Sequence, residues 1–145
     1  MPSLVGSEMC IRDRTRTAQQ ERILTAGARS LGRAFQRVNF LRDWAADTGQ
    51  LHRVYLPEAA AGLDGPARDA VVASIRCDLA EADAAIPLLD PGARPAVQAA
   101  RDLFGELTDR LARTDPQRLR RDRIRVPAPR KAALLLRAAT RRSRA

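Results

Sequence analysis

The chain has 145 residues, of which 3% are aromatic, and a formal net charge of +9 at neutral pH. This length fits one domain with one core, and the abundance of alanine, leucine and arginine favours helices over a sheet. No apolar run approaches the roughly 20 residues that a membrane-spanning helix needs. Cys10 and Cys77 fit neither a metal-binding spacing nor an evident disulfide pair. We therefore expect a reduced, cytoplasmic protein.

The positive charge is concentrated at the C-terminal end of the chain. Residues 117–145 contain ten arginines and Lys131 against Asp122, a net of +10, so the other residues carry +9 less +10, or −1. A small basic protein that binds nucleic acid is one reading of this run. A solvated or phosphate-facing tail is the simpler reading, and we expect no nucleic-acid partner. Contact with anionic lipid at the periphery of a membrane is a further expectation.

The first fourteen residues, MPSLVGSEMCIRDR, lack the order of basic and apolar regions that marks a secretion signal. The string VGSEMCIRDR resembles translated sequencing-adapter DNA. We therefore expect residues 1–14 to be a non-native leader, with a genuine N-terminal segment as the alternative.

The first predicted helix runs from about Thr17 to Asp47. Apolar residues recur on one of its faces at helical spacing, at positions 24, 31, 35, 38 and 45. Gly27 and Gly32 predict close packing against other helices rather than a break. The stretch 51–65, which holds proline and glycine, predicts a connector with at most a short helix.

Further helices follow, and prolines mark their limits. Pro66 and Pro95 suit the first turns of a second and a third helix. The pair Asp115-Pro116 interrupts the third helix. After an extended link, residues 131–141 predict a final short helix. The fold class expected is all-α, with about four helices and a short connector helix.

Polar residues lie on the first helix opposite its apolar face. Gln36, Asn39, Asp43 and Asp47 follow one another at steps of three, four and four, which places them within roughly 80° of one another. Two carboxylates one turn apart, with amides before them, can share a divalent cation, and Mg²⁺ is usually held by such carboxylates together with substrate phosphates. Arg42 adds a fork suited to diphosphate oxygens. Taken alone, the pattern is also what a solvated helix face offers, and that reading stays open.

The wider context is more specific. Residues 31–57, LGRAFQRVNFLRDWAADTGQLHRVYLP, resemble the second aspartate-rich signature of squalene and phytoene synthases. That pattern runs LG-x-A-x-Q-x-x-N-x-x-R-D-x-x-x-D and is followed by R-x-Y-L-P. The likeness continues more loosely through ARDLFGELTDRL and RIRVPAPRKAALL. The resemblance implies a partial squalene/phytoene synthase domain over 15–142 and a basic tail at 143–145. It also implies the C-terminal part of an isoprenoid-synthase-type helical bundle.

The resemblance implies a prenyltransferase that joins two prenyl diphosphates, farnesyl or geranylgeranyl, head to head in isoprenoid or carotenoid biosynthesis. Asp43 and Asp47 would be catalytic ligands of Mg²⁺, or of Mn²⁺ in its place, with Asn39 as a further ligand. NADPH would be required only by a squalene-type enzyme. The residues expected to contact the substrate diphosphate are Arg42, Gln36, Asn39 and Arg123.

Three features depart from the family pattern. No earlier aspartate-rich motif occurs upstream of Thr15, so we expect this chain to be a fragment that is inactive alone. Phe104 stands where the late helix of the family usually has a tyrosine, which leaves room for a non-catalytic scaffold or assembly factor. His52 stands where glycine is common. The chain length of the substrate and the identity of the product stay open.

Overall fold

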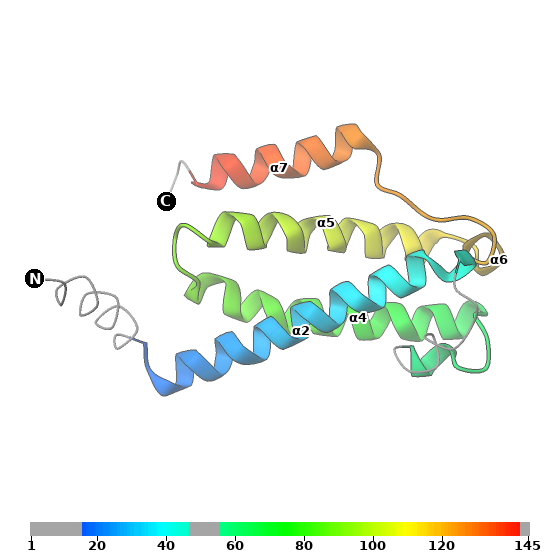
Figure 1. Ribbon diagram of the computed structural model, residues 1–145, viewed down its shortest axis with the longest axis horizontal. Helices are drawn as coiled ribbons and strands as arrows, with labels where there is room; N and C mark the ends of the chain where they lie inside the picture. Colours follow the sequence, from blue (N-terminus) through cyan, green and yellow to red (C-terminus); the bar gives the residue numbers. More distant parts are fainter. Residues whose placement is uncertain (1–15, 47–55, 143–145) are drawn as a thin grey trace, which may run out of the picture.

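The computed structural model describes residues 16–46 and 56–142, and within this part of the chain there are helices and no strand. The long helices of this part are α2 (Ala18–Arg42), α4 (Gly65–Ala85), α5 (Arg94–Arg113) and α7 (Ala128–Arg142), shown in Figure 1. Its short helical turns are η1 (Trp44–Ala46), η2 (Pro57–Ala59), η3 (Ile86–Leu88) and α6 (Pro116–Leu119). The predicted all-α fold, with about four helices and a short connector helix, is confirmed.

The helices begin where the sequence supplies caps. Thr17 and Gln20 form a capping box at the start of α2: the Gln20 amide donates to the Thr17 hydroxyl at 3.1 Å, and the Thr17 amide donates to the Gln20 side chain at 2.9 Å. Asp64 caps α4 by accepting from the amide of Ala67 at 2.8 Å. Pro66 and Pro95 lie in the first turns of α4 and α5, as predicted, because a missing N–H costs nothing there.

Two predicted helix limits are wrong. The first helix ends at Arg42 rather than continuing to Asp47, and the following 3₁₀ turn directs Trp44 against the hydrophobic core. Asp47 lies outside the described residues. The last helix begins at Ala128 rather than at Lys131, because Pro129 is accommodated in its first turn.

The core lies where α2, α4 and α5 meet, and Leu56, Ala59 and Leu63 around η2 and Leu119 and Val126 of α6 and the segment after it complete it. Its fully buried large side chains include Leu41, Leu56, Leu63, Ile75, Leu111 and Leu119. The face of α2 that is buried differs from the apolar face expected from the sequence. Its buried residues are Gly27, Ser30, Ala34, Val38 and Leu41. Leu24, Leu31 and Phe35 lie beside this face and line a groove.

Helices α2 and α4 approach each other closely along this face. A methyl group on Gly27 would overlap the side chain of Ala85, so glycine is required there, whereas nothing lies within 4 Å of the equivalent position on Gly32. Close packing is therefore confirmed for Gly27 and is wrong for Gly32. The same interface contains a polar cluster in which Arg33 donates to buried Asp78 at 2.9 and 3.1 Å, and Ser30 donates to Glu81.

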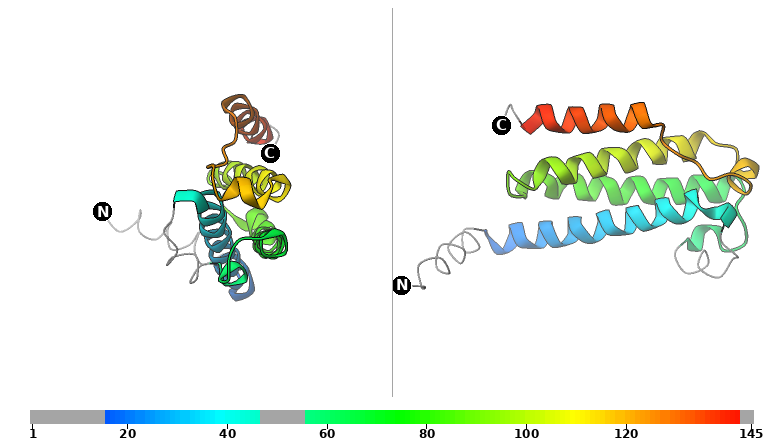
Figure 2. Two further views of the ribbon diagram at one scale, coloured as in Figure 1. Left: turned by 90° about the vertical axis from the view of Figure 1, so that its right-hand side faces the viewer. Right: turned by 45° about the horizontal axis from the view of Figure 1, so that its top comes forward.

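Helix α7 is the outermost of these helices. Figures 1 and 2 show α7 next to α5, on the side of α5 that faces away from α2 and α4. Leu134 and Ala138 of α7 are buried against α5, and Arg130 of α7 forms an ion pair with Glu106 of α5 at 3.2 Å. Among the described residues, no helix is both long enough and apolar enough to span a bilayer.

Candidate anion site at the end of helix α2

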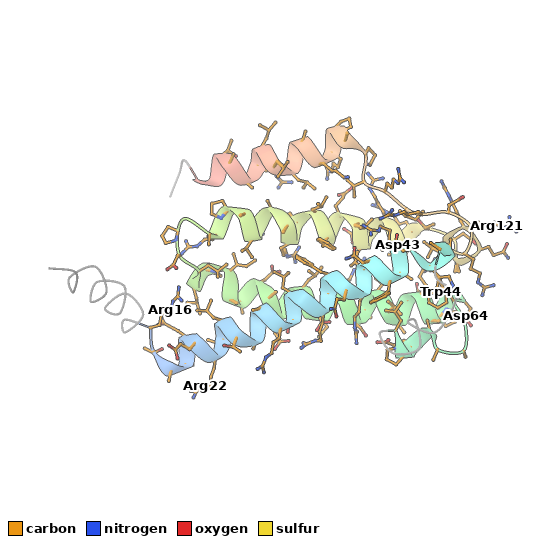
Figure 3. The ribbon with its side chains drawn as sticks, in the orientation of Figure 1. Arg16, Arg22, Asp43, Trp44, Asp64 and Arg121 are labelled. Carbon is orange, nitrogen blue, oxygen red and sulfur yellow. The ribbon has the colours of Figure 1, made fainter. Side chains whose placement is uncertain are left out.

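Three of the sequence-predicted residues, Arg42, Asp43 and Arg123, come together at the C-terminal end of α2. Asp43 is the C-cap residue, and its backbone N–H donates to the carbonyl of Asn39 at 2.9 Å. Figure 3 shows Asp43 at this end of the helix, close to the chain around α6. The extended segment after α6 brings Arg123 to the same place, although it is distant in the sequence.

Two guanidinium groups hold the Asp43 carboxylate. Arg42 donates to its two oxygens, from Nε to Oδ1 at 3.0 Å and from Nη2 to Oδ2 at 2.8 Å. Nε of Arg123 lies 2.7 Å from Oδ1. The hydrogen bonds from Arg42 lower the pKa of Asp43 below its ordinary value; burial opposes this effect, while the charges of Arg42 and Arg123 reinforce it. The carboxylate is therefore ionised under ordinary conditions.

A basic hollow of about 330 Å³ lies beside this pair of arginines. Its polar lining is entirely cationic, and its floor is apolar. The basic residues are Arg42, Arg123, Arg125 and Lys131, and the apolar residues are Leu103, Phe104, Leu107, Ile124 and Val126. Four cations without an acidic lining residue suit an anion, because nothing in the wall repels negative charge.

An apolar groove of about 320 Å³ runs along the middle of α2, from Leu24 to Phe35. It is lined by α2, the end of α4, η3 and α5, with residues Leu24, Gly27, Ala28, Leu31, Gly32, Phe35, Ala82, Ala85, Ile86, Leu89 and Val97. Phe35 of this groove stacks on Phe104 of the basic hollow, with ring centroids 3.8 Å apart and an angle of 17° between the ring planes. The stacked pair therefore lies between the basic hollow and the apolar groove.

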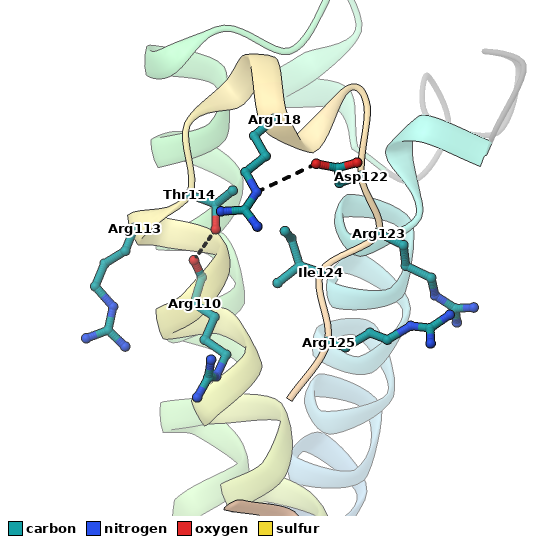
Figure 4. A pocket seen from close by; sticks show the side chains of 8 residues that line it. All are labelled: Arg110, Arg113, Thr114, Arg118, Asp122, Arg123, Ile124 and Arg125. Atoms are coloured by element: carbon teal, nitrogen blue, oxygen red, sulfur yellow. Dashed lines mark hydrogen bonds and ion pairs between the residues drawn. The ribbon is translucent and has the colours of Figure 1, made fainter. Parts of the chain in front are cut away.

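A second basic hollow, of about 730 Å³, lies between the C-terminal end of α5, Arg118 and the segment 122–125 (Figure 4). It shares Arg123 and Arg125 with the first hollow. Figure 4 shows the side chains of Arg110 and Arg113 directed away from those of Arg123 and Arg125, and Arg118 is paired with Asp122 at 3.7 Å. Its arginines do not converge on one point, so the first hollow is the better candidate for a compact anion.

The predicted site residues divide into three groups. The structure brings Arg42, Asp43 and Arg123 together. Asn39 lies one turn before Asp43 and is half-buried, whereas Gln36 is exposed and lies about 10 Å from Asp43 along the helix axis. Asp47 lies outside the described residues, so its position relative to the site is untested.

The sequence interpretation did not single out Arg125, Lys131 or the Phe35–Phe104 pair. Arg125 and Lys131 stand in the closing stretch RIRVPAPRKAALL, whose likeness to the family was the available signal. Stacking between α2 and α5 has no signal in local spacing, because it depends on how the two helices pack.

The residue types at this site suit a hard divalent cation, but the described residues do not assemble a ligand set for one. Asn39 and Asp43 offer an amide and a carboxylate from adjacent turns, and such oxygens are preferred by Mg²⁺. The described residues hold no cluster of three acidic, histidine or cysteine side chains. Both oxygens of Asp43 accept from arginines, so a cation at Asp43 would compete with Arg123 for Oδ1.

The fold and site thus define an all-α protein with a carboxylate–arginine cluster beside a basic hollow that adjoins an apolar groove. The sequence profile of the squalene/phytoene synthase family matches residues 7–62. This stretch includes all of α2 and Asp43, so this part of the chain is similar to the squalene/phytoene synthase family, in agreement with the resemblance of its motif. The match begins within residues 1–14, whose assignment as a leader stays a prediction. No curated protein and no solved structure matches the chain.

Proposed function

We propose that this chain supplies the second aspartate-rich part of a prenyltransferase site that condenses two prenyl diphosphates head to head. The observation that carries the proposal is the position of Asp43. It stands in the family-matched segment, between Arg42 and Arg123, at a basic hollow that adjoins an apolar groove.

The two hollows suit the two halves of a prenyl diphosphate. Arg42 and Arg123 would bind the diphosphate and neutralise the charge that grows on it as it departs. The groove lined by Leu24, Leu31 and Phe35 would hold the hydrocarbon tail and exclude water from it. Leu24 and Arg42 are about 27 Å apart along the axis of α2, so a long amphiphile could follow the helix from head to tail.

We propose that Asp43, Asp47 and Asn39 hold Mg²⁺ in the complete site, with Gln36 in support of the diphosphate. The ion would supply Lewis-acid neutralisation of the leaving diphosphate. The chain's own contribution includes the exchange of partners at Arg123. A diphosphate would give this guanidinium an alternative anion, which would leave Arg42 as the remaining partner of Oδ1 of Asp43 and open this oxygen to a further ligand.

We further propose that the chain does not turn over substrate by itself, because the family pairs this motif with an earlier one. Whether the complete site forms phytoene or, with NADPH, squalene would be decided by groups beyond the basic hollow. The cationic segment 117–145 also favours peripheral contact with an anionic membrane.

Ligand preference tests the proposal. Isothermal titration calorimetry of the chain with farnesyl diphosphate, inorganic pyrophosphate and farnesol, each with Mg²⁺, separates the contributions of head and tail. We expect farnesyl diphosphate to bind at least about tenfold more tightly than either of the other two, because it fills both hollows. Equal affinity for pyrophosphate and farnesyl diphosphate would show that the groove does not bind the hydrocarbon tail.

A second candidate function is a non-catalytic scaffold with this fold. It is favoured by Phe104, which contributes a stacked ring and no hydroxyl to the basic hollow. If the chain is a scaffold that has lost the site, it should not bind farnesyl diphosphate. If the prenyltransferase proposal is right, it should bind this ligand even without turnover.

A further inference from the structure

The outward face of α7 is apolar although no other helix of the described chain covers it. Leu135 and Leu136 are 63% and 67% exposed, and they are the exposed large hydrophobic residues among those that the structure describes. Leu134 and Ala138 occupy the opposite side of the helix, buried against α5. At 100° per residue, Leu136 points about 180° away from the midpoint of this buried pair.

Other residues extend this face into a strip along the helix. Helical spacing places them on the same side as Leu135 and Leu136, and all of them are exposed: Ala128, Pro129, Ala132 and Ala139. We call these six residues the outer strip. The strip runs most of the length of α7 and consists of two large and four small apolar residues.

Cations border the outer strip on both sides. Lys131 lies beyond Leu135 on one edge, and Arg137 lies beyond Leu136 on the other. From Ala128 to Ala145 the sequence holds six basic residues and neither aspartate nor glutamate. The aliphatic part of a long basic side chain beside an apolar face can contact the acyl chains of a bilayer while its charged end stays among the lipid headgroups.

We infer that the outer strip of α7 docks on an anionic lipid surface, with the helix lying parallel to the membrane plane. The positive charge on both edges of the strip favours an anionic bilayer over a second copy of the chain as the partner. A second copy of the chain would bring two basic edges together, which repel, whereas an anionic bilayer complements both edges. The two leucines, three alanines and one proline of the strip insert only shallowly, so the attraction of the headgroups is required as well.

This inference rests on the peripheral contact proposed above and identifies the surface that makes it. It is independent of prenyl-diphosphate binding, because no residue of the outer strip lines the basic hollow or the apolar groove. Lys131 borders the strip and also lines the basic hollow, so the test of lipid binding uses Leu135, Leu136 and Arg137, which line neither cavity; lipid binding and ligand binding can then fail separately.

Co-sedimentation with vesicles tests the inference on the full chain. We expect binding to vesicles of phosphatidylcholine and phosphatidylserine, and little binding to phosphatidylcholine alone. The double variant Leu135→Ser/Leu136→Ser should weaken binding to the mixed vesicles by about tenfold or more. The matched control is Ala70→Ser/Ala73→Ser, two exposed positions on α4, which should bind as the unmodified chain does. Circular dichroism verifies that each variant keeps its helices.

A second variant tests the basic edge. Arg137→Gln should lower binding to the mixed vesicles and reduce its sensitivity to salt, without altering the hydrophobic strip. The inference is overturned if the chain binds both vesicle types equally, or if the leucine variant binds the mixed vesicles as before. A third contrary result combines two measurements. Light scattering would show that the unmodified chain is a dimer and the leucine variant a monomer, while the two bind lipid equally. The strip would then be an interface between copies.

Discussion

Nε of Arg123 lies 2.7 Å from Oδ1 of Asp43, and this contact joins the end of α2 to the segment that follows α6. The two residues are far apart in the chain. Each of them would be an ordinary surface charge on its own segment. Together with Arg42 they form a cluster beside the basic hollow, and this cluster is the basis of the proposed function.

The first prediction concerns the titration of Asp43. Its pKa in the folded protein is lowered from the ordinary 3.8, with the Arg42 hydrogen bonds as the largest cause. Arg42→Gln should therefore raise this pKa more than Arg123→Gln does, and both should raise it relative to the unmodified chain. Carboxyl-carbon NMR measures the titration, with Arg121→Gln as the control because Arg121 lines neither hollow at this site.

The same shift gives a pH dependence of stability. A lowered pKa in the folded state means that the ionised form is favoured by folding. The stabilisation is present above the ordinary pKa of 3.8 and is lost as the pH falls through the folded-state value. The account would be contradicted if Asp43 titrated at its ordinary pKa and the two arginine variants left it there.

The second prediction compares two glycines of α2. Gly27→Ala should destabilise the chain by about 1–3 kcal/mol, because the new methyl overlaps Ala85 and separates α2 from α4. Gly32→Ala should instead stabilise it by about 0.5–1 kcal/mol, because the position is open and alanine favours the helix. Urea unfolding measures both variants. Equal effects of the two substitutions would contradict the close approach of the helices at Gly27.

The third prediction concerns the polar cluster between α2 and α4. Asp78 is buried and accepts two hydrogen bonds from Arg33, so Asp78→Ala should cost about 2–3 kcal/mol of stability. The control is Asp109→Ala on α5, since Asp109 and its partner Arg76 are both more than half exposed. That change should cost about 0–1 kcal/mol. A similar loss in both variants, measured by urea unfolding, would show that burial of Asp78 adds nothing.

The starts of α2, α4 and α5 could be predicted from local residues, because capping and proline geometry act within one turn, whereas the start of α7 was predicted three residues too late. Pro66 and Pro95 fall in the first turns of their helices for this reason. The end of α2 could not be predicted. Helical spacing continues from Asp43 to Asp47 in the sequence, but the packing of Trp44 against the core turns the chain after Arg42.

The site could be predicted in part. Asp43 and Arg42 followed from spacing and from the family motif, and Arg123 was suggested only by the likeness of the closing stretch. The contact between Arg123 and Asp43 depends on the path of the segment after α6, which no local pattern describes. The apolar stripe at Leu24, Leu31 and Phe35 was recognised as a face of the helix, but it lines a groove beside the core instead of forming the core.

The central claim is that the cluster at Asp43 binds the diphosphate of a prenyl ligand. The most direct measurement is the affinity for farnesyl diphosphate of Arg123→Gln, set against Arg121→Gln, by isothermal titration calorimetry with Mg²⁺. Arg123→Gln should weaken binding by about tenfold or more, because it removes one charge-assisted contact from the head site. Arg121→Gln should leave the affinity unchanged. Equal affinities of the two variants and the unmodified chain would contradict the claim.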